Sequence, residues 1–390
     1  MNQKQITKVV FLSNYFSHHQ KSFSDEMFAT LGDGYFFIET ETMDDERKKL
    51  GWGMTAFPSY VVTNEKLQKN IEFYMDLINS ADVVIVGSAP DYLISQRKRE
   101  KNLIFRYHER PLKKGDEPLK YIYRFVKWRM MNKPRHNIYM LCASAYTAAD
   151  YAKFGLFKKK CYKWGYFPFV VQYEDINSLI SQKKNNSIIW VARFIDWKHP
   201  ELAISVAEKL KEDGYKFTLD MIGTGELLEQ MKSDVLKRGL SDYVTIHGAM
   251  TPEEVRKYME QSEIHIFTSD RNEGWGAVLN ESMNSACAVV ASHAIGAVPF
   301  MVEDGNNGLV YQDGNENDLY LKVKKLLDNE DLRKDCGINA YNTVIKDWNA
   351  EVAAERIVIL AQSIVEGNIY PNVYNSGLCS QADVIKNDWC

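Results

Sequence analysis

Short runs of β-forming residues alternate with helix-length amphipathic segments along most of this 390-residue chain. In the first half the predicted strands are residues 9–12, 35–38, 83–86, 103–107 and 138–142. In the second half they are residues 188–192, 217–222, 244–247, 264–268, 288–291 and 308–311. Such alternation is typical of parallel sheets with helices on both faces, and the length suffices for two domains with separate cores. The sequence therefore predicts a two-domain α/β protein.

The domain boundary is predicted between Phe167 and Asn186, where an aromatic stretch precedes the polar run 181–187. We assign residues 1–175 to a first α/β domain and residues 186–347 to a second. A helix is predicted at 350–366, within a separate segment 348–366, and it has no following strand to pack with. The tail, residues 367–390, has little periodicity and predicts no more than a surface strap.

Composition excludes several classes of protein. The formal charge of -4 gives no reason to expect nucleic acid. No apolar run approaches the roughly 18–20 residues that cross a bilayer, and we expect no signal peptide. The six cysteines never stand at C-x-x-C spacing, which argues against zinc or a redox pair and for reduced thiols in a cytoplasm.

The most specific passage is residues 269–286, in which Glu273 and Glu281 flank a Gly-x-Gly turn after a predicted strand. A helix beginning near Gly276 would carry Glu281 and leave Glu273 on the preceding loop. The backbone amides between the two glutamates belong to Gly274, Trp275, Gly276 and Ala277. These amides could face an anion such as a diphosphate. A helix start with an acidic residue near its positive end is the structural alternative.

Two further features follow predicted strands of the second half. Arg193 and Lys198 come after the first of these strands, where open α/β sheets bind ligands, and two cations can neutralise two phosphates. A solvated turn is the alternative. Gly223 and Gly225 follow the next strand, but a lone G-x-G is more often only a tight turn.

Together, in this order and spacing, these residues resemble glycosyltransferase family 4, the nucleotide-sugar glycosyltransferases with the GT-B fold. The likeness spans roughly residues 187–366, including the turn Gly305-Asn-Asn-Gly308. It is looser in the first half, where it rests on His108 and on residues 143–150. The resemblance implies two Rossmann-like domains facing a cleft, with the C-terminal helix crossing back to the first domain.

The resemblance also implies roles for individual residues. Arg193 and Lys198 would hold the donor diphosphate, Glu281 the ribose, and Glu273 would lie against the donor sugar. His108 would lie near the reacting sugar, unless it is only a packed or surface histidine. The catalytic candidates are thus Glu273, His108, Arg193 and Lys198. The predicted donor-binding residues are Arg193, Lys198, Gly223, Gly225, His247, Glu273, Gly274, Trp275, Gly276, Ala277 and Glu281.

The chain departs from the family's pattern in two loops. The first strand-to-helix loop, residues 13–21, lacks the usual glycines. We therefore expect His18, His19 or Lys21 to approach phosphate or acceptor, the alternative being a polar loop. No carboxylate or third histidine stands at ligand spacing, so no metal is expected there. Ala297 and Phe300 replace a glycine and a glutamate, which puts donor-sugar recognition in doubt.

A basic segment, residues 97–135, carries 14 Lys and Arg against four Asp and Glu. A helix over residues 118–131 would have an apolar core stripe of Leu119, Ile122, Tyr123, Val126 and Met130. Its other face would present Lys120, Arg124 and Lys127, flanked by Tyr121 and Trp128. Basic and aromatic groups on one helix face suit an anionic membrane surface. We therefore expect Lys120, Arg124, Lys127 and Trp128 to face a membrane; a solvated charged face is the alternative, and RNA is disfavoured.

The resemblance implies a retaining, metal-independent hexosyltransferase that needs no cofactor. It would move a sugar from a nucleotide donor, UDP-sugar by default, to a glycan or lipid-linked glycan in bacterial surface polysaccharide biosynthesis. We expect a cytoplasmic enzyme, peripheral on the inner face of the membrane. The rivals are a nucleotide-sugar epimerase of the same fold and an inactive nucleotide-binding protein. A dinucleotide oxidoreductase is disfavoured, because no G-x-G-x-x-G opens a strand–helix unit.

Overall fold

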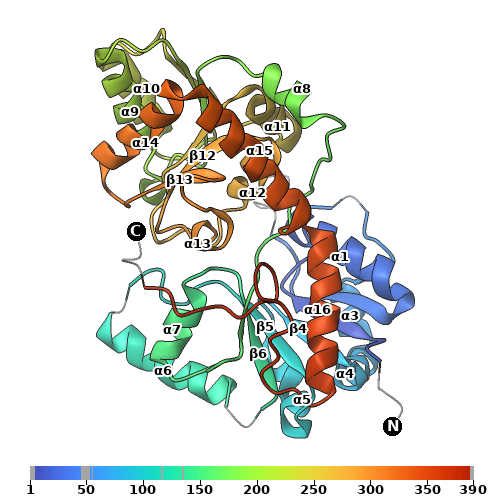
Figure 1. Cartoon of the computed structure of the whole chain (residues 1–390). Coiled ribbons are helices and arrows are strands. Elements are labelled where there is room, and N and C mark those ends of the chain that lie inside the picture. Colours follow the sequence, from blue (N-terminus) through green and yellow to red (C-terminus); the bar gives the residue numbers. More distant parts are fainter. Residues whose placement is uncertain (1–4, 45–52, 55, 116, 134–135, 387–390) are drawn as a thin grey trace. The chain divides into compact units, whose positions relative to one another are not determined.

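The computed structural model describes residues 5–44, 53–54, 56–115, 117–133 and 136–386. The chain divides into two compact units (Figure 1). The first comprises Met1–Phe169 together with Asn349–Ile385, and the second comprises Val170–Trp348. Each unit is built on one parallel sheet, as the alternating pattern predicts.

The sheet of the first unit has the strand order β3-β2-β1-β4-β5-β6-β7. Its strands are β1 (Val9–Ser13), β2 (Tyr35–Glu39), β3 (Val61–Val62), β4 (Val83–Val86), β5 (Ile104–His108), β6 (Ile138–Cys142) and β7 (Cys161–Lys163). Its helices are α1 (His18–Leu31), α3 (Asn64–Lys69), α4 (Ile71–Ser80), α5 (Ser95–Glu100), α6 (Pro118–Met131), α7 (Thr147–Lys153) and α16 (Ala350–Val365). The five predicted strands are confirmed to within one residue. The strands β3 and β7 were missed because two or three residues show no periodicity.

The sheet of the second unit has the order β10-β9-β8-β11-β12-β13. Its strands are β8 (Ser187–Val191), β9 (Thr218–Ile222), β10 (Val244–Gly248), β11 (Ile264–Phe267), β12 (Ala288–Ser292) and β13 (Gly308–Tyr311). Its helices are α8 (Ile176–Ser181), α9 (Pro200–Glu212), α10 (Leu228–Lys237), α11 (Pro252–Gln261), α12 (Ala277–Asn284), α13 (Val298–Met301), α14 (Glu316–Asp328) and α15 (Glu330–Lys346). All six strands predicted for this half are confirmed to within one residue.

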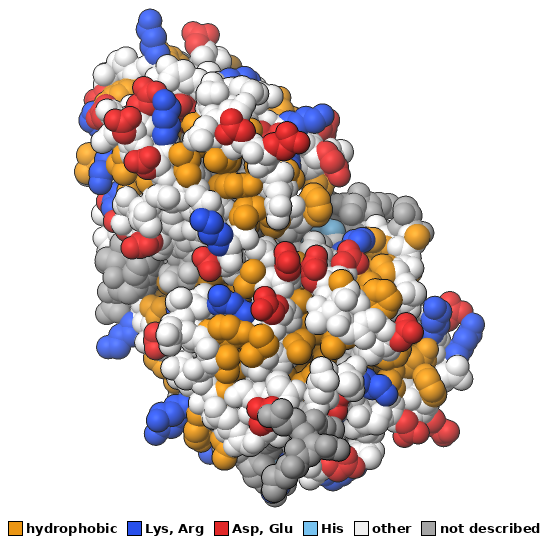
Figure 2. All heavy atoms as spheres, turned by 45° about the vertical axis from the view of Figure 1, so that its right-hand side comes forward, with side chains coloured by type: hydrophobic (Ala, Val, Ile, Leu, Met, Phe, Trp, Pro, Cys, Tyr) orange, Lys and Arg blue, Asp and Glu red, His pale blue; other side chains and the backbone are white. Residues whose placement is uncertain are grey.

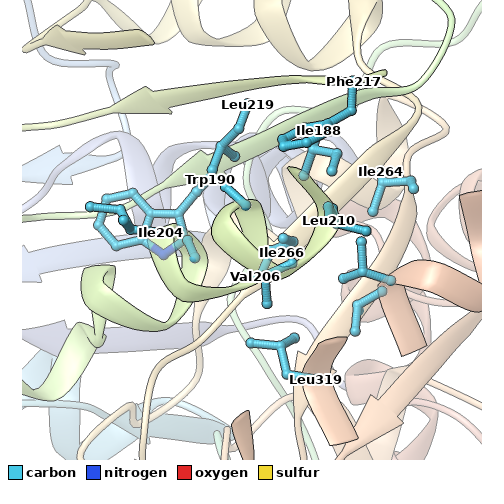
Figure 3. Packing of buried hydrophobic residues seen from close by; sticks show 14 of the residues in the cluster. Ile188, Trp190, Ile204, Val206, Leu210, Phe217, Leu219, Ile264, Ile266 and Leu319 are labelled. Carbon is cyan, nitrogen blue, oxygen red and sulfur yellow. The ribbon is translucent and has the colours of Figure 1, made fainter. Parts of the chain in front are cut away.

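The core of the second unit forms between α9 and the sheet (Figure 3). Val206 and Leu210 lie on one stripe of α9, and with Ile204 they are buried against the strands that carry Trp190 and Ile266. Burying a side chain of this size contributes about 1.5–3 kcal/mol. Since β8 and β11 both lie in this core, the loops that leave their carboxyl ends start from rigid positions.

The C-terminal segment belongs to the first unit. Helix α16 packs against α1 (Figure 1). The tail beyond it is tied to the β7 edge of the sheet by backbone hydrogen bonds between Lys163 and both Cys379 and Ser380, and by a bridge between Tyr162 and Gln381. Backbone N–H and C=O groups of the edge strand β7 are thereby hydrogen-bonded. None of the helices that the structure describes is both long and apolar enough to span a bilayer.

The predicted orientation of α6 is wrong. The stripe assigned to the core is exposed, from 50% at Val126 to 84% at Leu119. Packing against Phe154 and its neighbours comes instead from the face that carries Tyr121, Phe125 and Trp128. Both faces of the helix are apolar, so periodicity alone could not decide which one is buried. Trp128, expected to face a membrane, packs inward.

The basic segment 97–135 is also not one surface. Arg97 is fully buried and donates hydrogen bonds to the carbonyl oxygens of Ile78, Ala81 and Leu103. Lys98 and Arg106 pair with Asp91, and Arg110 pairs with Asp150. These four cations hold the first unit together and are not available to a partner. Arg135 and Cys390 lie outside the described residues.

Candidate functional site

The two most specific motifs come together at the centre of the second sheet. Strands β9 and β10 lie on one side of β8, and β11, β12 and β13 lie on the other. The strand order therefore reverses between β8 and β11. In open α/β sheets, ligands bind in the crevice at such a switch point, beyond the carboxyl ends of the strands. The loop after β8 carries Lys198, and the loop after β11 carries Glu273.

Lys198 and Glu273 form a close ion pair, although 75 residues separate them in the sequence. Both side chains are largely shielded, with 12% and 11% of their surface exposed. Ser269 Oγ also donates a hydrogen bond to Glu273 Oε2, at 3.0 Å. The Lys198 ammonium lies 4.4 Å from the centre of the Trp197 ring. An ammonium has three donors, so Lys198 can hold Glu273 and still donate to a phosphate oxygen.

The backbone of Lys198 is fixed from inside the core. Trp190 Nε1 donates to Thr268 Oγ1 at 2.8 Å, and Thr268 Oγ1 in turn donates to the carbonyl oxygen of Lys198 at 2.6 Å. The amide of Asp270 donates to the carbonyl oxygen of Trp197 at 3.1 Å. The loops after β8 and β11 are thus tied together by buried hydrogen bonds, which are stronger where water is excluded.

Two glycines let a third loop approach the Arg193 segment closely. A Cβ on Gly223 would stand 1.9 Å from the carbonyl oxygen of Ala192, and one on Gly225 would stand 2.3 Å from that of Phe194. The amide of Phe194 donates to the carbonyl oxygen of Thr224 at 2.9 Å. The structure therefore gives both glycines a packing role beside their predicted donor contact. Arg193 itself is exposed, with its guanidinium 5.8 Å from the centre of the Trp197 ring.

Helix α12 begins as predicted, with Gly276 as its N-cap. Gly276 has φ 93°, and a Cβ there would stand 2.7 Å from Cζ of Phe267, so no other residue fits. No side chain caps this end, and the first amides of a helix have no intrahelical acceptor. Glu281 lies on the second turn, and burial raises its pKa. Trp275 is fully buried with Nε1 bound to Asn280, so it can reach a ligand only through its backbone.

His247, predicted to contact the donor, lies at the carboxyl end of β10. His247 Nε2 lies 2.6 Å from Asp220 Oδ1, so this ring nitrogen is already engaged inside the unit. Among the residues that the structure describes, no group of three or more His, Cys, Asp or Glu side chains is arranged to hold a metal ion.

Sequence reasoning missed a charged cluster next to Lys198. His199 Nδ1 lies 2.8 Å from Glu201, and its Nε2 lies 3.7 Å from Asp270. The two carboxylates, Asp270 first, raise the pKa of His199 to about 10, so the ring is cationic at neutral pH. Burial opposes ionisation of Asp270, but hydrogen bonds from His199 and Asn272 outweigh it and lower its pKa. His199, which directly follows Lys198 in the sequence, was the feature from which this cluster could have been predicted.

In the first unit, His108 is the last residue of β5. Its Nδ1 donates to the carbonyl oxygen of Glu109 at 2.7 Å, because a carbonyl only accepts. The ring packs edge-on against Trp128 and Tyr151. Burial lowers the pKa of His108, so it is neutral near pH 7 with Nε2 as an acceptor. It lies in a different unit from the Lys198 and Glu273 pair.

The segment from His18 to Lys21 is helical, not a loop. Ser17 caps α1, and His18 is its first residue. Burial lowers the pKa of both histidines, and burial together with His18 brings that of His19 to about 4. Lys21 pairs with Asp25 at 2.5 Å one turn along the helix. Neither histidine therefore brings a positive charge to a phosphate at neutral pH.

The match to a protein-family model lies within the second unit. Residues 171–343 match the model of the family described as glycosyl transferases group 1. An uncharacterized glycosyltransferase of Methanocaldococcus jannaschii is 29% identical over 199 residues, which are 50% of this chain and 53% of that protein. An N-acetylgalactosamine-N,N'-diacetylbacillosaminyl-diphospho-undecaprenol 4-alpha-N-acetylgalactosaminyltransferase of Campylobacter jejuni is 29% identical over 151 residues, 39% of this chain and 40% of that one. The chain thus matches about half the length, or less, of these curated relatives.

The whole fold is shared with solved structures. The crystal structure of Anabaena HepE in complex with UDP covers 91% of this chain and 100% of its own, with a TM-score of 0.68 and 15% identity. The two Rossmann-like units are those of the GT-B glycosyltransferases, as the sequence predicts. At this identity the likeness establishes the fold alone.

Proposed function

We propose that the chain is a glycosyltransferase that moves a sugar from a nucleotide donor, a UDP-sugar, to a glycan or lipid-linked glycan. The observation that carries this proposal is the Lys198 and Glu273 pair at the β8/β11 switch point, beside the uncapped N-terminus of α12. All three lie within the residues matched by the group 1 family model. A shielded cation and open helix amides are what a diphosphate leaving group needs.

In this mechanism the second unit stabilises the departing nucleoside diphosphate. Lys198, Arg193 and the first amides of α12 supply positive potential without a metal ion. Glu273 orients both Lys198 and the donor sugar, and Glu281 binds the ribose. The acceptor hydroxyl attacks the oxocarbenium-like sugar on the face that the diphosphate leaves, and its proton passes to the leaving phosphate oxygen. Configuration is therefore retained, and no covalent nucleophile is required.

The acceptor side is assigned to the first unit. Neutral His108, with Nε2 as an acceptor, suits a hydrogen bond from a sugar hydroxyl. The name of the Campylobacter jejuni relative includes a diphospho-undecaprenol acceptor, which supports a lipid-linked glycan as the acceptor class. The HepE complex supports UDP as the nucleotide. Together these favour a hexosyltransferase of bacterial surface polysaccharide biosynthesis, acting at the cytoplasmic face of the membrane.

The first test is thermal stabilisation by UDP, GDP, ADP and NAD, each in the presence of EDTA. A nucleotide at about 100 times its dissociation constant should stabilise the protein by roughly 2.7 kcal/mol. We expect UDP to do so, Glu281→Ala to abolish the shift, and the exposed control Glu229→Ala to retain it. No shift with any nucleotide, or equal shifts in both variants, would contradict the assignment.

Analysis of the reaction products distinguishes the transferase from the two alternative functions. An epimerase of the same fold would convert a nucleotide sugar with no acceptor present, and an inactive nucleotide-binding protein would release no diphosphate with any acceptor. UDP release that requires a glycan acceptor, followed by anomeric analysis of the product, distinguishes the transferase from both.

A further inference from the structure

Helix α6 presents an apolar face to solvent. Its exposed residues are Leu119 (84%), Ile122 (59%), Tyr123 (66%), Val126 (50%) and Met130 (66%). At 100° per residue, these five side chains fall within an arc of about 100° on the helix. The opposite side carries Tyr121, Phe125 and Trp128, which pack on the first unit. The exposed face is therefore not needed to hold the helix in place.

Basic residues flank this apolar face. Viewed down the helix axis at the same 100° per residue, Lys120 and Lys127 lie along one border of the apolar arc and Arg129 lies along the other. All three are exposed, although Arg129 also donates to the carbonyl oxygen of Phe154 at 3.2 Å. Lys127 leans over the Tyr123 ring, with its ammonium 5.9 Å from the ring centre. Arg124, further round, is half-buried and donates to the carbonyl oxygen of Gly115.

No acidic residue occurs anywhere in α6. The nearest carboxylate along the chain is the N-cap Glu117, which pairs with Lys120 at 2.8 Å. The helix is preceded by exposed Lys114 and followed by exposed Lys133. On the face drawn in Figure 2, by contrast, acidic and basic side chains are interspersed among the hydrophobic ones. The α6 face therefore combines an apolar centre with borders of one sign.

We propose that this face of α6 is a docking site for an anionic lipid bilayer. The apolar centre would lie in the boundary between headgroups and acyl chains, with the helix parallel to the membrane plane. Lys120, Lys127 and Arg129 would then lie at the level of the phosphates, and Tyr123 suits the same depth. Charge complementarity selects this occupant, because a neutral apolar partner would leave the basic borders without counterions. The proposal does not depend on the proposed transferase activity.

Vesicle flotation tests the charge and the apolar centre separately. Wild type should bind phosphatidylglycerol-containing vesicles and not phosphatidylcholine vesicles, with affinity falling as salt rises. The double variant Lys120→Glu/Lys127→Glu should bind at least about tenfold more weakly, and so should Ile122→Gln/Val126→Gln. Glutamine keeps helix propensity at exposed positions, so folding should persist.

Matched controls come from other exposed helices of the first unit. Lys66→Glu/Lys69→Glu on α3 makes the same change in charge, and Phe73→Gln on α4 removes a side chain that is 65% exposed. Both should bind vesicles as wild type does. The UDP-induced thermal shift is measured on every variant, so that failure of the nucleotide assignment is seen separately.

Three results would overturn the proposal. These are equal binding of wild type to neutral and anionic vesicles, losses in the controls as large as in the α6 variants, and no vesicle binding at all. If, in the last case, wild type forms a dimer in sedimentation that Ile122→Gln/Val126→Gln abolishes, the face belongs to a second copy of the chain instead.

Discussion

Helices α1 and α12 each begin where the strand order of their own sheet reverses, but they differ in how their N-termini are satisfied. The order reverses between β1 and β4 in the first sheet and between β8 and β11 in the second; α1 follows β1, and α12 follows β11. The first amides of α1 are capped by its own sequence, through a capping box of Ser17 and Gln20. The N-cap of α12 is Gly276, which has no side chain to offer.

This difference separates a structural helix start from one able to bind an anion. Capped amides cannot donate to a ligand, whereas uncapped amides beside Lys198 can. The histidines at the start of α1 are also neutral near pH 7, because burial lowers their pKa. We therefore expect diphosphate to bind in the second unit and not at α1.

The largest effect is expected from the charged pair. Lys198→Ala and Glu273→Gln should each lower turnover with a UDP-sugar at least about tenfold, and up to about a thousandfold, because leaving-group stabilisation is lost. Steady-state UDP release measures this. Lys209→Ala, which removes an ion pair between α9 and the first residue of α14, Glu316, is the control. Near-normal turnover in both variants would remove the proposed role of the pair.

Gly276→Ala should disturb the backbone at the N-terminus of α12. The added Cβ would overlap the buried Phe267 ring, and φ 93° is strained for alanine, so we expect a loss of roughly 2–4 kcal/mol in unfolding free energy and weaker UDP binding. Gly248→Ala is the matched control. It also has positive φ, but its Cβ would have no neighbour within 4 Å. Chemical denaturation should give a smaller loss for the control; equal losses would mean that the close approach to Phe267 is unimportant.

Removing the cap of α1 should affect stability alone. Ser17→Ala is expected to lower the unfolding free energy by about 1 kcal/mol and to leave the dissociation constant of UDP unchanged. Thr251→Ala, at the capping box of α11, should cost a similar amount. A Ser17→Ala variant that binds UDP several-fold more weakly would place phosphate recognition at α1 after all.

The smallest effect is a pH dependence of stability from His199. Its folded pKa of about 10 exceeds the unfolded value near 6.5, so its contribution is fully present below pH 6.5 and is lost as pH rises through about 10. His199→Gln should therefore lower the melting temperature by about 2–4 °C at pH 6. The difference from wild type should shrink toward pH 10. A difference independent of pH would show that charge on His199 is not what stabilises the loop.

Most of the fold could be predicted from the sequence, because the strands are buried runs bounded by polar turns. The start of α12 at Gly276 and the strand-end positions of Arg193, Lys198 and Glu273 also followed from spacing along the chain. The start of α1 was missed, since Ser17 and His18 were assigned to a loop. The His199 cluster was missed because its carboxylate Asp270 comes from another strand end.

The sequence by itself thus determined the two parallel sheets and which residues stand at their carboxyl ends, since both follow from local periodicity and chain order. Only the tertiary structure decided which cations are free and which are structural. Arg97 and Arg110 look like surface charges in the sequence, yet one is surrounded by carbonyl oxygens and the other is paired with Asp150. It also decided that α6 buries the face with Tyr121, Phe125 and Trp128 and exposes the face with Leu119, Ile122 and Tyr123. An amphipathic pattern records which faces are apolar, but the face that is buried depends on the shape of what it packs against.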